Sequence, residues 1–297
     1  MTRVGPPTLT CGALTLKLSP AKGGSIARLD YAAPNGKQIA ILRGVAGEED
    51  DVLGHGSFPL VPYCNRIRGG RFAFRGREVG IAPNMPGDPS PLHGQGWLAA
   101  WEVVALDEAS AELVFVHAAG EWPWRYEARQ HFRLDAGGLS VVLSCTNLSD
   151  EPMPCGLGQH PYFHCTPQTV LATDVKSVWT IDEDVLPVAR EPARGRYDLR
   201  ARQVCGQDLD NGFGGWGGRC VIADPALPVR IEMSSPDADF FQLYSPASGA
   251  IFVAEPVSHA NAALNAPEAE WPELGLRALE PGETMRLTMR IDVVPVQ

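Results

Sequence analysis

Short runs in which apolar and polar residues alternate recur along the chain, and Gly, Pro, Asn and Asp separate them. Alternation places successive side chains on opposite faces of a strand, so the pattern predicts antiparallel sheets with one solvated face. The clearest runs are RFAFRG at 71–76, YEARQHFRLD at 126–135, GLSVVLSCTN at 138–147 and RLTMRIDVV at 286–294. The residues DAGG at 135–138 predict a hairpin turn between the second run and the third.

Helical periodicity is absent over any window of a dozen residues, and proline interrupts candidates such as PEAEWPELG at 267–275. The sequence therefore predicts an all-β chain without a convincing helix. Glycine and proline are spread along the length, with no repeat and no low-complexity linker, so we expect one domain over residues 1–297. Periodicity alone leaves both a large sandwich and a barrel open.

Charge and hydropathy narrow the choice of partner. The formal net charge of −10 disfavours nucleic acid, whose binding depends on Lys and Arg at phosphates, and favours a neutral small molecule. No apolar stretch is long enough for a membrane span, and the first 20 residues contain no signal-peptide core. We expect a cytoplasmic protein without a membrane partner; the sequence leaves open whether it is a monomer or a homodimer.

The seven cysteines are scattered, odd in number and free of any C-x-x-C pair. This pattern argues against both a disulfide framework and a structural zinc site. We interpret the cysteines as reduced thiols that mostly fill apolar space.

Two polar segments in the first third of the chain do not resemble plain scaffold. Asn65 and Arg66 lie between an apolar run and a Gly-Gly turn, where the arginine is either a surface charge or a fork for oxygen-rich ligands. His93 lies in LHGQGW, where two glycines permit close approach by a ligand or another backbone. Trp97 or Trp101 then offers an apolar face to a ring.

The segment GLGQHPYFHC at 156–165 carries two histidines four positions apart. Pro161 favours an extended conformation at His160, and in an extended chain the Cα atoms of His160 and His164 lie about 13 Å apart. A shared metal is therefore disfavoured, and we predict no metal site. The remaining alternatives are a strand-end histidine and a proton carrier that titrates near neutral pH.

Glu255 follows the apolar run AIFVA and precedes Pro256, which we expect to end the strand. Desolvation at such a position raises a carboxyl pKa and suits a general base, whereas the plain alternative is a carboxylate that reaches solvent.

Together these segments resemble the aldose 1-epimerase (galactose mutarotase) family. The matching blocks occur in the family's order from about residue 55 onward: FPLVPYCNRIRGGRFAFRG, LHGQGW, GQHPYF, LDNGF, FQLYS, VAEPVSHANAALN and LEPGETMRLTMRI. The resemblance implies a β-supersandwich of the galactose mutarotase type and interconversion of the α and β anomers of a free sugar. One departure is PVSHANAALN after Glu255, where the galactose enzymes tend to have PDAxN, and this puts a preference for galactose in doubt.

Roles of single residues follow from the resemblance alone. It implies His160 as general acid and Glu255 as general base, with no cofactor. The residues implied for sugar binding are Arg66, His93, Asp210, Gln242 and Asn65. Asp208, two residues before Asp210, is the alternative for the aspartate.

A proton-transfer pair of this kind predicts a bell-shaped dependence of rate on pH. Three other functions remain as alternatives. A carbohydrate-binding module uses the same sandwich without turnover, and a β-sandwich glycoside hydrolase would use two carboxyls such as Asp210 and Glu255. A metal-dependent jelly-roll enzyme is disfavoured because the chain lacks a close H-x-H pair.

Overall fold

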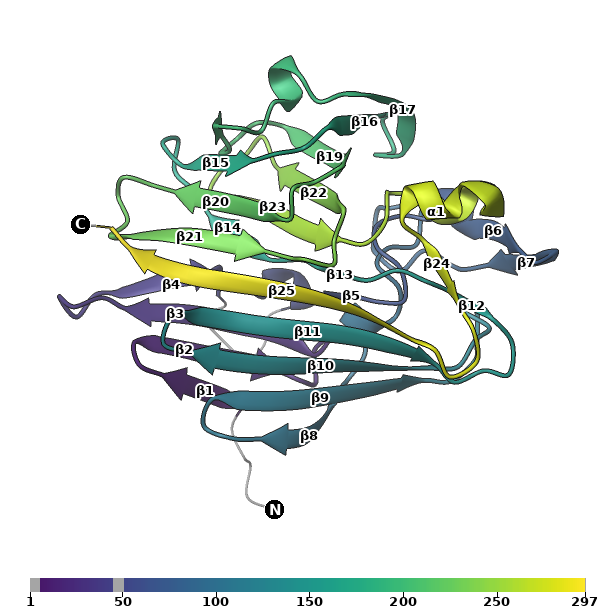
Figure 1. Cartoon of the computed structure of the whole chain (residues 1–297), viewed down its shortest axis with the longest axis horizontal. Coiled ribbons are helices and arrows are strands. Elements are labelled where there is room, and N and C mark those ends of the chain that lie inside the picture. The colour runs from purple at the N-terminus through teal and green to yellow at the C-terminus, as the bar shows by residue number, and fades with distance from the viewer. Residues whose placement is uncertain (1–5, 45–50, 297) are drawn as a thin grey trace.

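The computed structural model describes residues 6–44 and 51–296, and strands dominate it (Figure 1). The all-β class predicted from alternation is confirmed. Residues 1–5, which begin the stretch predicted to lack a signal sequence, lie outside the described residues. No helix in the described residues is long and apolar enough to cross a membrane.

The larger sheet in the described residues contains nine strands. In sheet order they are β18 (Arg202–Gln203), β15 (Val170–Thr173), β20 (Arg219–Ala223), β21 (Val229–Ser234), β25 (Thr284–Pro295), β11 (Gly138–Asn147), β10 (Tyr126–Asp135), β9 (Ser110–His117) and β8 (Glu102–Leu106). The four alternating runs read from the sequence all form strands, and three of them, in β10, β11 and β25, lie side by side at the centre of this sheet.

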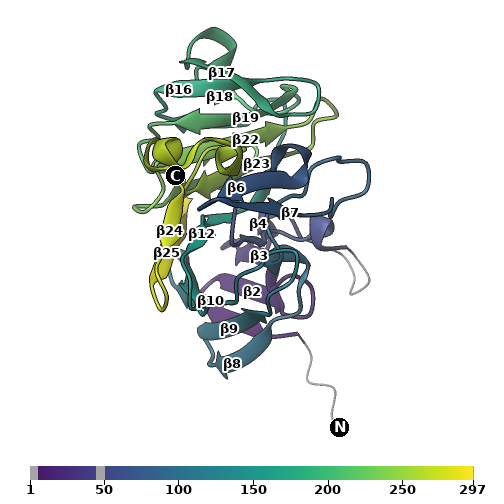
Figure 2. The same cartoon turned by 90° about the vertical axis from the view of Figure 1, so that its right-hand side faces the viewer.

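The second large sheet carries most of the site described below. Its order over the described residues is β17 (Pro187–Pro192), β16 (Ser177–Ile181), β19 (Leu209–Gly214), β22 (Phe240–Ser245), β23 (Ile251–Val257), β13 (Gly158–Gln159) and β5 (Pro59–Leu60), with β14 (Tyr162–His164) also paired to β23. Figure 2 shows the molecule from the side, with β25 and β10 on its left and β23, β3 and β4 to their right.

Smaller sheets and short helical turns complete the described chain. The sheets are β1 (Thr8–Cys11), β2 (Leu14–Ser19), β3 (Ser25–Ala32) and β4 (Gln38–Leu42); β6 (Arg71–Phe74) with β7 (Arg77–Gly80); and β12 (Met153–Cys155) with β24 (Arg277–Leu279). The 3₁₀ turns span Val52–Gly54, Arg68–Gly70, Gly96–Leu98, Gly195–Tyr197, Ala263–Asn265 and Glu268–Glu270, and the α-helix α1 spans Trp271–Leu274.

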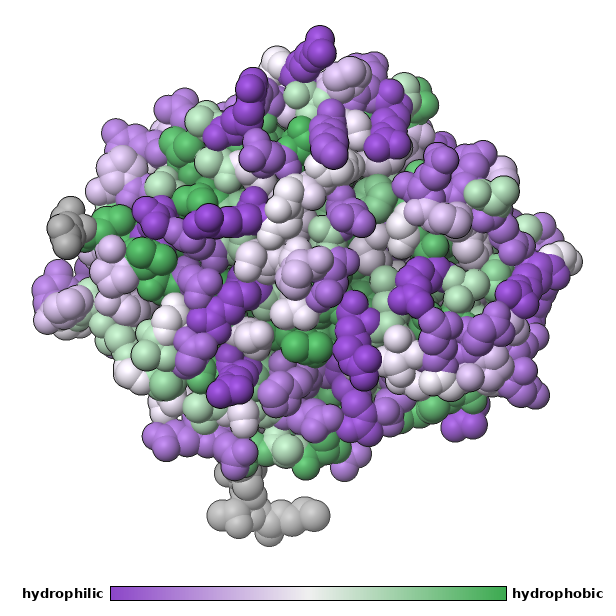
Figure 3. Space-filling model, in the orientation of Figure 1, coloured by the Kyte–Doolittle hydropathy of each residue, from purple (hydrophilic) through white to green (hydrophobic). Residues whose placement is uncertain are grey.

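Alternation in the central strands separates a dry face from a wet one. The inward side chains of β10 are buried, whereas Arg129, His131 and Arg133 between them are exposed. The space-filling view shows a mostly hydrophilic outer surface with scattered apolar residues (Figure 3). Full burial of a leucine such as Leu143 contributes about 1.5–3 kcal/mol, so these strands supply much of the hydrophobic stabilisation.

The predicted turn at 135–138 is confirmed, since Asp135 pairs with Gly138 across the β10–β11 hairpin. The Asp135 carboxylate accepts hydrogen bonds from the amides of Gly137 and Gly138, at 2.8 and 3.1 Å. Most buried apolar residues of the described chain form one large cluster, and a smaller second cluster includes Phe58, Trp97 and Tyr162. The single domain expected over residues 1–297 stays a prediction.

Two expectations about local structure are wrong. The window 267–275 contains a 3₁₀ turn and α1, because Pro272 lies in the first turn of α1, where its missing amide costs nothing. Pro256 does not end β23, which continues to Val257. On one side β23 pairs with β14 up to Val253 and with β13 only at Val257, and proline is tolerated at such an interruption.

Candidate functional site

A pocket of about 370 Å³ lies against the second large sheet, and six of the seven residues predicted for the site line it. These six are Asn65, Arg66, His93, His160, Asp210 and Glu255. They come from the loop after β5, the segment before the 3₁₀ turn at 96–98, the β13–β14 junction, β19 and β23. Segments almost 200 positions apart therefore meet around one cavity.

His160 and Glu255 lie close together among the residues that line this pocket. His160 Nε2 lies 3.5 Å from Glu255 Oε1, and the two residues are only 8% and 3% exposed. The imidazole stacks on Phe58 with 4.3 Å between ring centroids. His160 Nδ1 and Glu255 Oε2 are buried without a hydrogen-bond partner in the described chain. Unsatisfied buried polar atoms are costly, and both of these belong to residues that line the pocket.

Burial favours the neutral form of both groups. Desolvation lowers the pKa of His160 to about 3, with a smaller contribution from the Arg43 charge. Desolvation, together with the Asp210 carboxylate, raises the pKa of Glu255 well above its usual range. Both shifts favour the uncharged forms, a protonated Glu255 carboxyl and an unprotonated His160 imidazole.

Gln159, the residue before His160, connects this site to the nine-stranded sheet. Its side-chain Nε2 donates to Gln130 Oε1 of β10 at 3.2 Å, and Gln130 Nε2 in turn donates to the Gly24 carbonyl at 2.7 Å. The His160 amide donates to the Phe58 carbonyl at 3.0 Å. Because buried polar groups of this kind are satisfied in only one arrangement, they fix where His160 lies.

Arg66 is a partly buried hydrogen-bond donor rather than a surface charge, with 11% of its side chain exposed. Its Nε donates to Asp88 Oδ2 at 2.9 Å, and one terminal nitrogen donates to Asn65 Oδ1 at 3.2 Å. The same nitrogen lies 3.9 Å from Asp210 Oδ2. Asp88, which does not line the pocket, thus binds Nε, while one terminal nitrogen lies near Asn65 and Asp210, which do line it.

The aspartate that reaches the pocket is Asp210, whereas Asp208 is exposed and does not line it. Gln242, expected beside the sugar ring, is not among the residues that line the pocket. It is 3% exposed and donates to Asp210 Oδ1 at 2.6 Å, so its clear role is to orient the aspartate. A direct contact of Gln242 with sugar stays a prediction.

His93 is held as a neutral hydrogen-bond donor. Its Nδ1 accepts the Asn65 amide proton at 3.1 Å, which assigns the ring proton to Nε2. Burial and the neighbouring His160 and Arg66 lower the pKa of His93 well below its usual range. Both Asn65 and His93 have positive φ, 58° and 59°, a strained conformation for residues with side chains that often accompanies function.

The glycines beside His93 serve a neighbouring backbone and not a ligand. At Gly94, with φ of +72°, a Cβ would lie 2.1 Å from the Val61 carbonyl oxygen. At Gly96 a Cβ would lie 2.4 Å from a Val61 methyl group. These glycines therefore allow the LHGQGW segment to pack on the chain that leads to Arg66.

Gly94→Ala is expected to reduce the free energy of unfolding by about 1–3 kcal/mol, because it adds both φ strain and this contact. Urea denaturation measures the loss. Gly76→Ala is the matched control, since Gly76 has φ of +77° but open space around it, and it should lose only about 1 kcal/mol. Equal losses in both variants would contradict the close-packing argument.

Several residues of the pocket were missed by sequence reasoning. Tyr162 and Arg43 form one wall, with the guanidinium carbon 3.7 Å from the centre of the tyrosine ring. Tyr162 was detectable, since it lies two residues beyond His160 in an extended segment and so faces the same side. Phe58, which was also missed, stacks on Trp97 at 5.3 Å between ring centroids. Trp97, one of the two tryptophans expected to offer an apolar face to a ring, lines the pocket beside it. Trp101 lies in the core, where its indole N–H donates to the Gly96 carbonyl at 2.9 Å.

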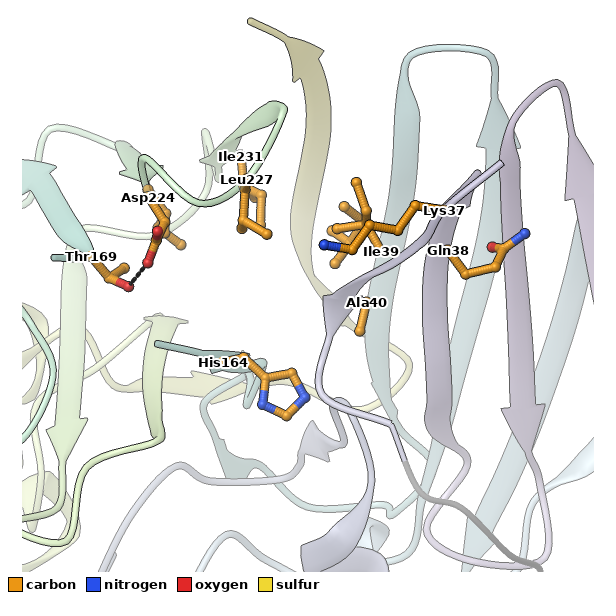
Figure 4. A pocket seen from close by; sticks show the side chains of 11 residues that line it. Lys37, Gln38, Ile39, Ala40, His164, Thr169, Asp224, Leu227 and Ile231 are labelled. Carbon is orange, nitrogen blue, oxygen red and sulfur yellow. Dashed lines mark hydrogen bonds between the residues drawn. The ribbon is translucent and has the colours of Figure 1, made fainter. Parts of the chain in front are cut away.

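His164 lies in a different cavity, as expected for an extended segment. It is one of the residues around a pocket of about 210 Å³ between β4 and the β20–β21 hairpin. Figure 4 shows its ring beneath Asp224, Leu227 and Ile231 on one side and Lys37, Ile39 and Ala40 on the other. Thr169 donates to Asp224 there, so that carboxylate is satisfied within the fold.

Residues 6–44 and 51–296 contain neither a cluster of metal ligands nor a disulfide bond. No group of three or more His, Cys, Asp or Glu side chains in this part of the chain is arranged to hold a metal ion. All seven cysteines are free thiols, as predicted, and Cys64, Cys145, Cys155 and Cys220 are buried.

Comparison with known proteins finds relatives that cover most of this chain. YphB of Escherichia coli K12, an uncharacterized protein, is 35% identical over 248 residues, which cover 79% of this chain and 83% of YphB. A solved structure from Escherichia coli K12, of a protein named after the aldose 1-epimerases, has a TM-score of 0.88 at 32% identity and covers 98% of this chain and 99% of its own.

More distant structures share the fold. A galactose mutarotase-like protein from Clostridium acetobutylicum has a TM-score of 0.85 at 18% identity, with 97% of this chain and 95% of that chain covered. The predicted fold of the galactose mutarotase type is thus confirmed. Residues 12–292 match the family described as aldose 1-epimerase, so the similarity extends further toward the N-terminus than the motifs did. The chain belongs to the aldose 1-epimerase family.

Proposed function

We propose that this protein interconverts the α and β anomers of a free aldose, with His160 and Glu255 as the proton carriers. The observation that carries the proposal is the contact of these two groups, 3.5 Å apart, in the wall of a pocket that also presents Arg66, His93 and Asp210. The anomeric hydroxyl and the ring oxygen of an aldose are both bonded to C1. Two adjacent proton carriers therefore reach both oxygens at once.

In the proposed reaction, ionised Glu255 takes the proton of the C1 hydroxyl while protonated His160 gives a proton to the ring oxygen. The bond from C1 to the ring oxygen breaks, and the open-chain aldehyde forms. Rotation about the C1–C2 bond presents the other carbonyl face, and reclosure returns both protons. The singly protonated pair supplies this state when its proton passes from the Glu255 carboxyl to the His160 imidazole.

The remaining polar residues are proposed to hold the sugar hydroxyls. Arg66 and the Nε2–H of His93 donate, while Asp210 accepts, and Asn65 lies beside the guanidinium. Phe58 and Trp97 provide an apolar surface for the C–H face of the ring. Positioning of the reacting groups accounts for much of such a rate enhancement.

The rate is expected to depend on pH as a bell, because the reaction needs one proton in the His160–Glu255 pair. Its acid limb should lie below the ordinary histidine pKa of about 6.5, since burial lowers the pKa of His160 to about 3. Its alkaline limb should lie above the ordinary glutamate pKa, since burial raises the pKa of Glu255. Initial rates from about pH 3 to 10, corrected for buffer catalysis, measure both limbs. A rate that does not change with pH over that whole range would exclude this pair.

Polarimetry on freshly dissolved α-D-galactose and α-D-glucose tests the function itself. Acceleration above the uncatalysed drift is the expected result, and a wider panel of aldoses then ranks substrates. Binding without acceleration of any aldose would support a carbohydrate-binding module instead. Release of nitrophenol from nitrophenyl glycosides would support a hydrolase, which needs two carboxyls at a defined separation.

A further inference from the structure

The loop that carries Asn65 and Arg66 has every backbone amide from Cys64 to Arg68 committed to a partner in another segment. The amides of Asn65 and Ile67 donate to His93 Nδ1 and to the Pro91 carbonyl, at 3.1 and 3.2 Å. The other three amides donate to side chains of the segment 259–265, almost 200 positions away in sequence.

Three side chains accept these amides. His259 Nε2 accepts from Cys64 at 2.9 Å, Asn261 Oδ1 accepts from Arg66 at 3.1 Å, and Asn265 Oδ1 accepts from Arg68 at 2.7 Å. We call His259, Asn261 and Asn265 the amide latch. The loop is thus held between two segments, with odd-numbered amides bound to one and even-numbered amides to the other.

The acceptors of the amide latch are themselves fixed. His259 is 2% exposed and donates from Nδ1 to the Ala260 carbonyl at 2.8 Å. Its ring lies so close to Gly156 that a Cβ there would be 1.9 Å from a ring carbon. The Asn261 amide nitrogen donates to the Val185 carbonyl at 2.9 Å. These contacts fix the orientations of the His259 and Asn261 side chains and thereby the position of the loop that they bind.

The latch is continuous with the strand that carries the proposed base. Glu255 lies in β23, and the chain runs from there directly into His259 and Asn261. Hydrogen bonds of Ser258 to Leu157, in both directions, tie this stretch to the segment before His160. One stretch of ten residues thus fixes Arg66 relative to both proton carriers.

We propose that His259 and Asn261 are positioning residues for the sugar-binding arginine, and that the segment PVSHANAALN is a device for aligning Arg66 with Glu255. This inference rests on the proposed function. Neither residue lines the pocket; His259 acts through the Cys64 amide and Asn261 through the Arg66 amide. Misplacement of a binding group by about 1 Å is enough to reduce catalysis severely.

Asn261→Leu keeps the side-chain volume and removes both hydrogen bonds. Its kcat/KM is expected to fall about 10-fold, mainly through KM, because the sugar is held less well in its ground and transition states alike. Asn261→Asp, which retains the acceptor for the Arg66 amide, should recover part of the loss. The control is Asn147→Leu, since Asn147 is buried, makes comparable side-chain hydrogen bonds and does not line the pocket; this variant should lose stability but no activity.

A double-mutant cycle with Arg66→Met separates positioning from general destabilisation. If the latch acts through the guanidinium, Asn261→Leu will change kcat/KM by less than about twofold in the Arg66→Met background. Multiplicative losses would overturn the proposal.

Amide hydrogen exchange tests the same latch without any need for turnover. Exchange of the Arg66 amide should accelerate in Asn261→Leu and not in Asn147→Leu, and unchanged exchange would overturn the proposal. A wild-type protein that accelerates no aldose would defeat the proposed function, whereas an active wild type with a fully active Asn261→Leu variant would defeat the latch alone.

Discussion

Glu255→Gln is expected to lower kcat by about 10²–10⁴-fold, the usual contribution of a positioned general base. The amide has nearly the shape of the carboxyl and fits the same buried position, but it cannot accept the anomeric proton. KM should change little, because Glu255 is proposed to act on the reacting atoms and the other hydroxyls are held elsewhere. Polarimetric progress curves over a range of sugar concentrations measure both constants.

Stability provides an independent check on the same variant. Folding favours the neutral carboxyl of Glu255, so its raised pKa stabilises the fold at acid pH, and this contribution is lost as pH rises toward the folded-state pKa. Glutamine stays neutral at every pH. The Tm of Glu255→Gln should therefore exceed that of the wild type increasingly as pH rises, with no difference near pH 4 or below.

His160→Gln supplies the matched comparison within the pair. If the two groups act as a unit, the double variant should be scarcely slower than either single variant. Full activity in Glu255→Gln, or multiplicative losses in the double variant, would contradict the assignment of the pair.

Local patterning predicted the strands well because each inward position of β10, β11 and β25 is apolar or internally satisfied. The same reasoning failed at Pro256 and at Pro272. A proline interrupts a strand or helix only where a neighbouring residue needs a hydrogen bond from the missing amide. That information lies in the pairing of β23 and in the start of α1, and no local window contains it.

The resemblance to the family was enough to predict which residues form the candidate site, but not which residues contact one another. The sequence gives no sign that Gln242 lies behind Asp210, that Asp88 holds Arg66, or that Arg43 covers Tyr162. Each of these contacts joins strands or loops that are distant along the chain. Likewise the sequence of PVSHANAALN indicates only a departure from the galactose enzymes. The structure shows that this segment forms hydrogen bonds with the loop at 64–68.

Arg66→Met is expected to lower kcat/KM by about 10²-fold, the second largest effect in the site. The variant removes the fork that is proposed to hold a sugar hydroxyl, and it also leaves the carboxylates of Asp88 and Asp210 without their cation. Asp88 keeps the Ser90 amide and Asp210 keeps the Gln242 side chain as donors, but each loses its charged partner, so the free energy of unfolding should fall by about 1–3 kcal/mol. Steady-state kinetics and urea denaturation measure the two losses separately.

Arg66→Lys distinguishes charge from geometry, since lysine keeps the charge but offers a single flexible ammonium in place of a planar fork. It should retain most of the stability and recover only part of the activity. Arg129→Met is the control, because Arg129 also binds two carboxylates, Glu112 and Glu127, but on the exposed face of the nine-stranded sheet. Exposed pairs contribute at most about 1 kcal/mol, so that variant should be fully active and nearly as stable as the wild type. If Arg66→Met behaves like Arg129→Met, the guanidinium does not bind the sugar, and the positioning role of Asn261 falls with it.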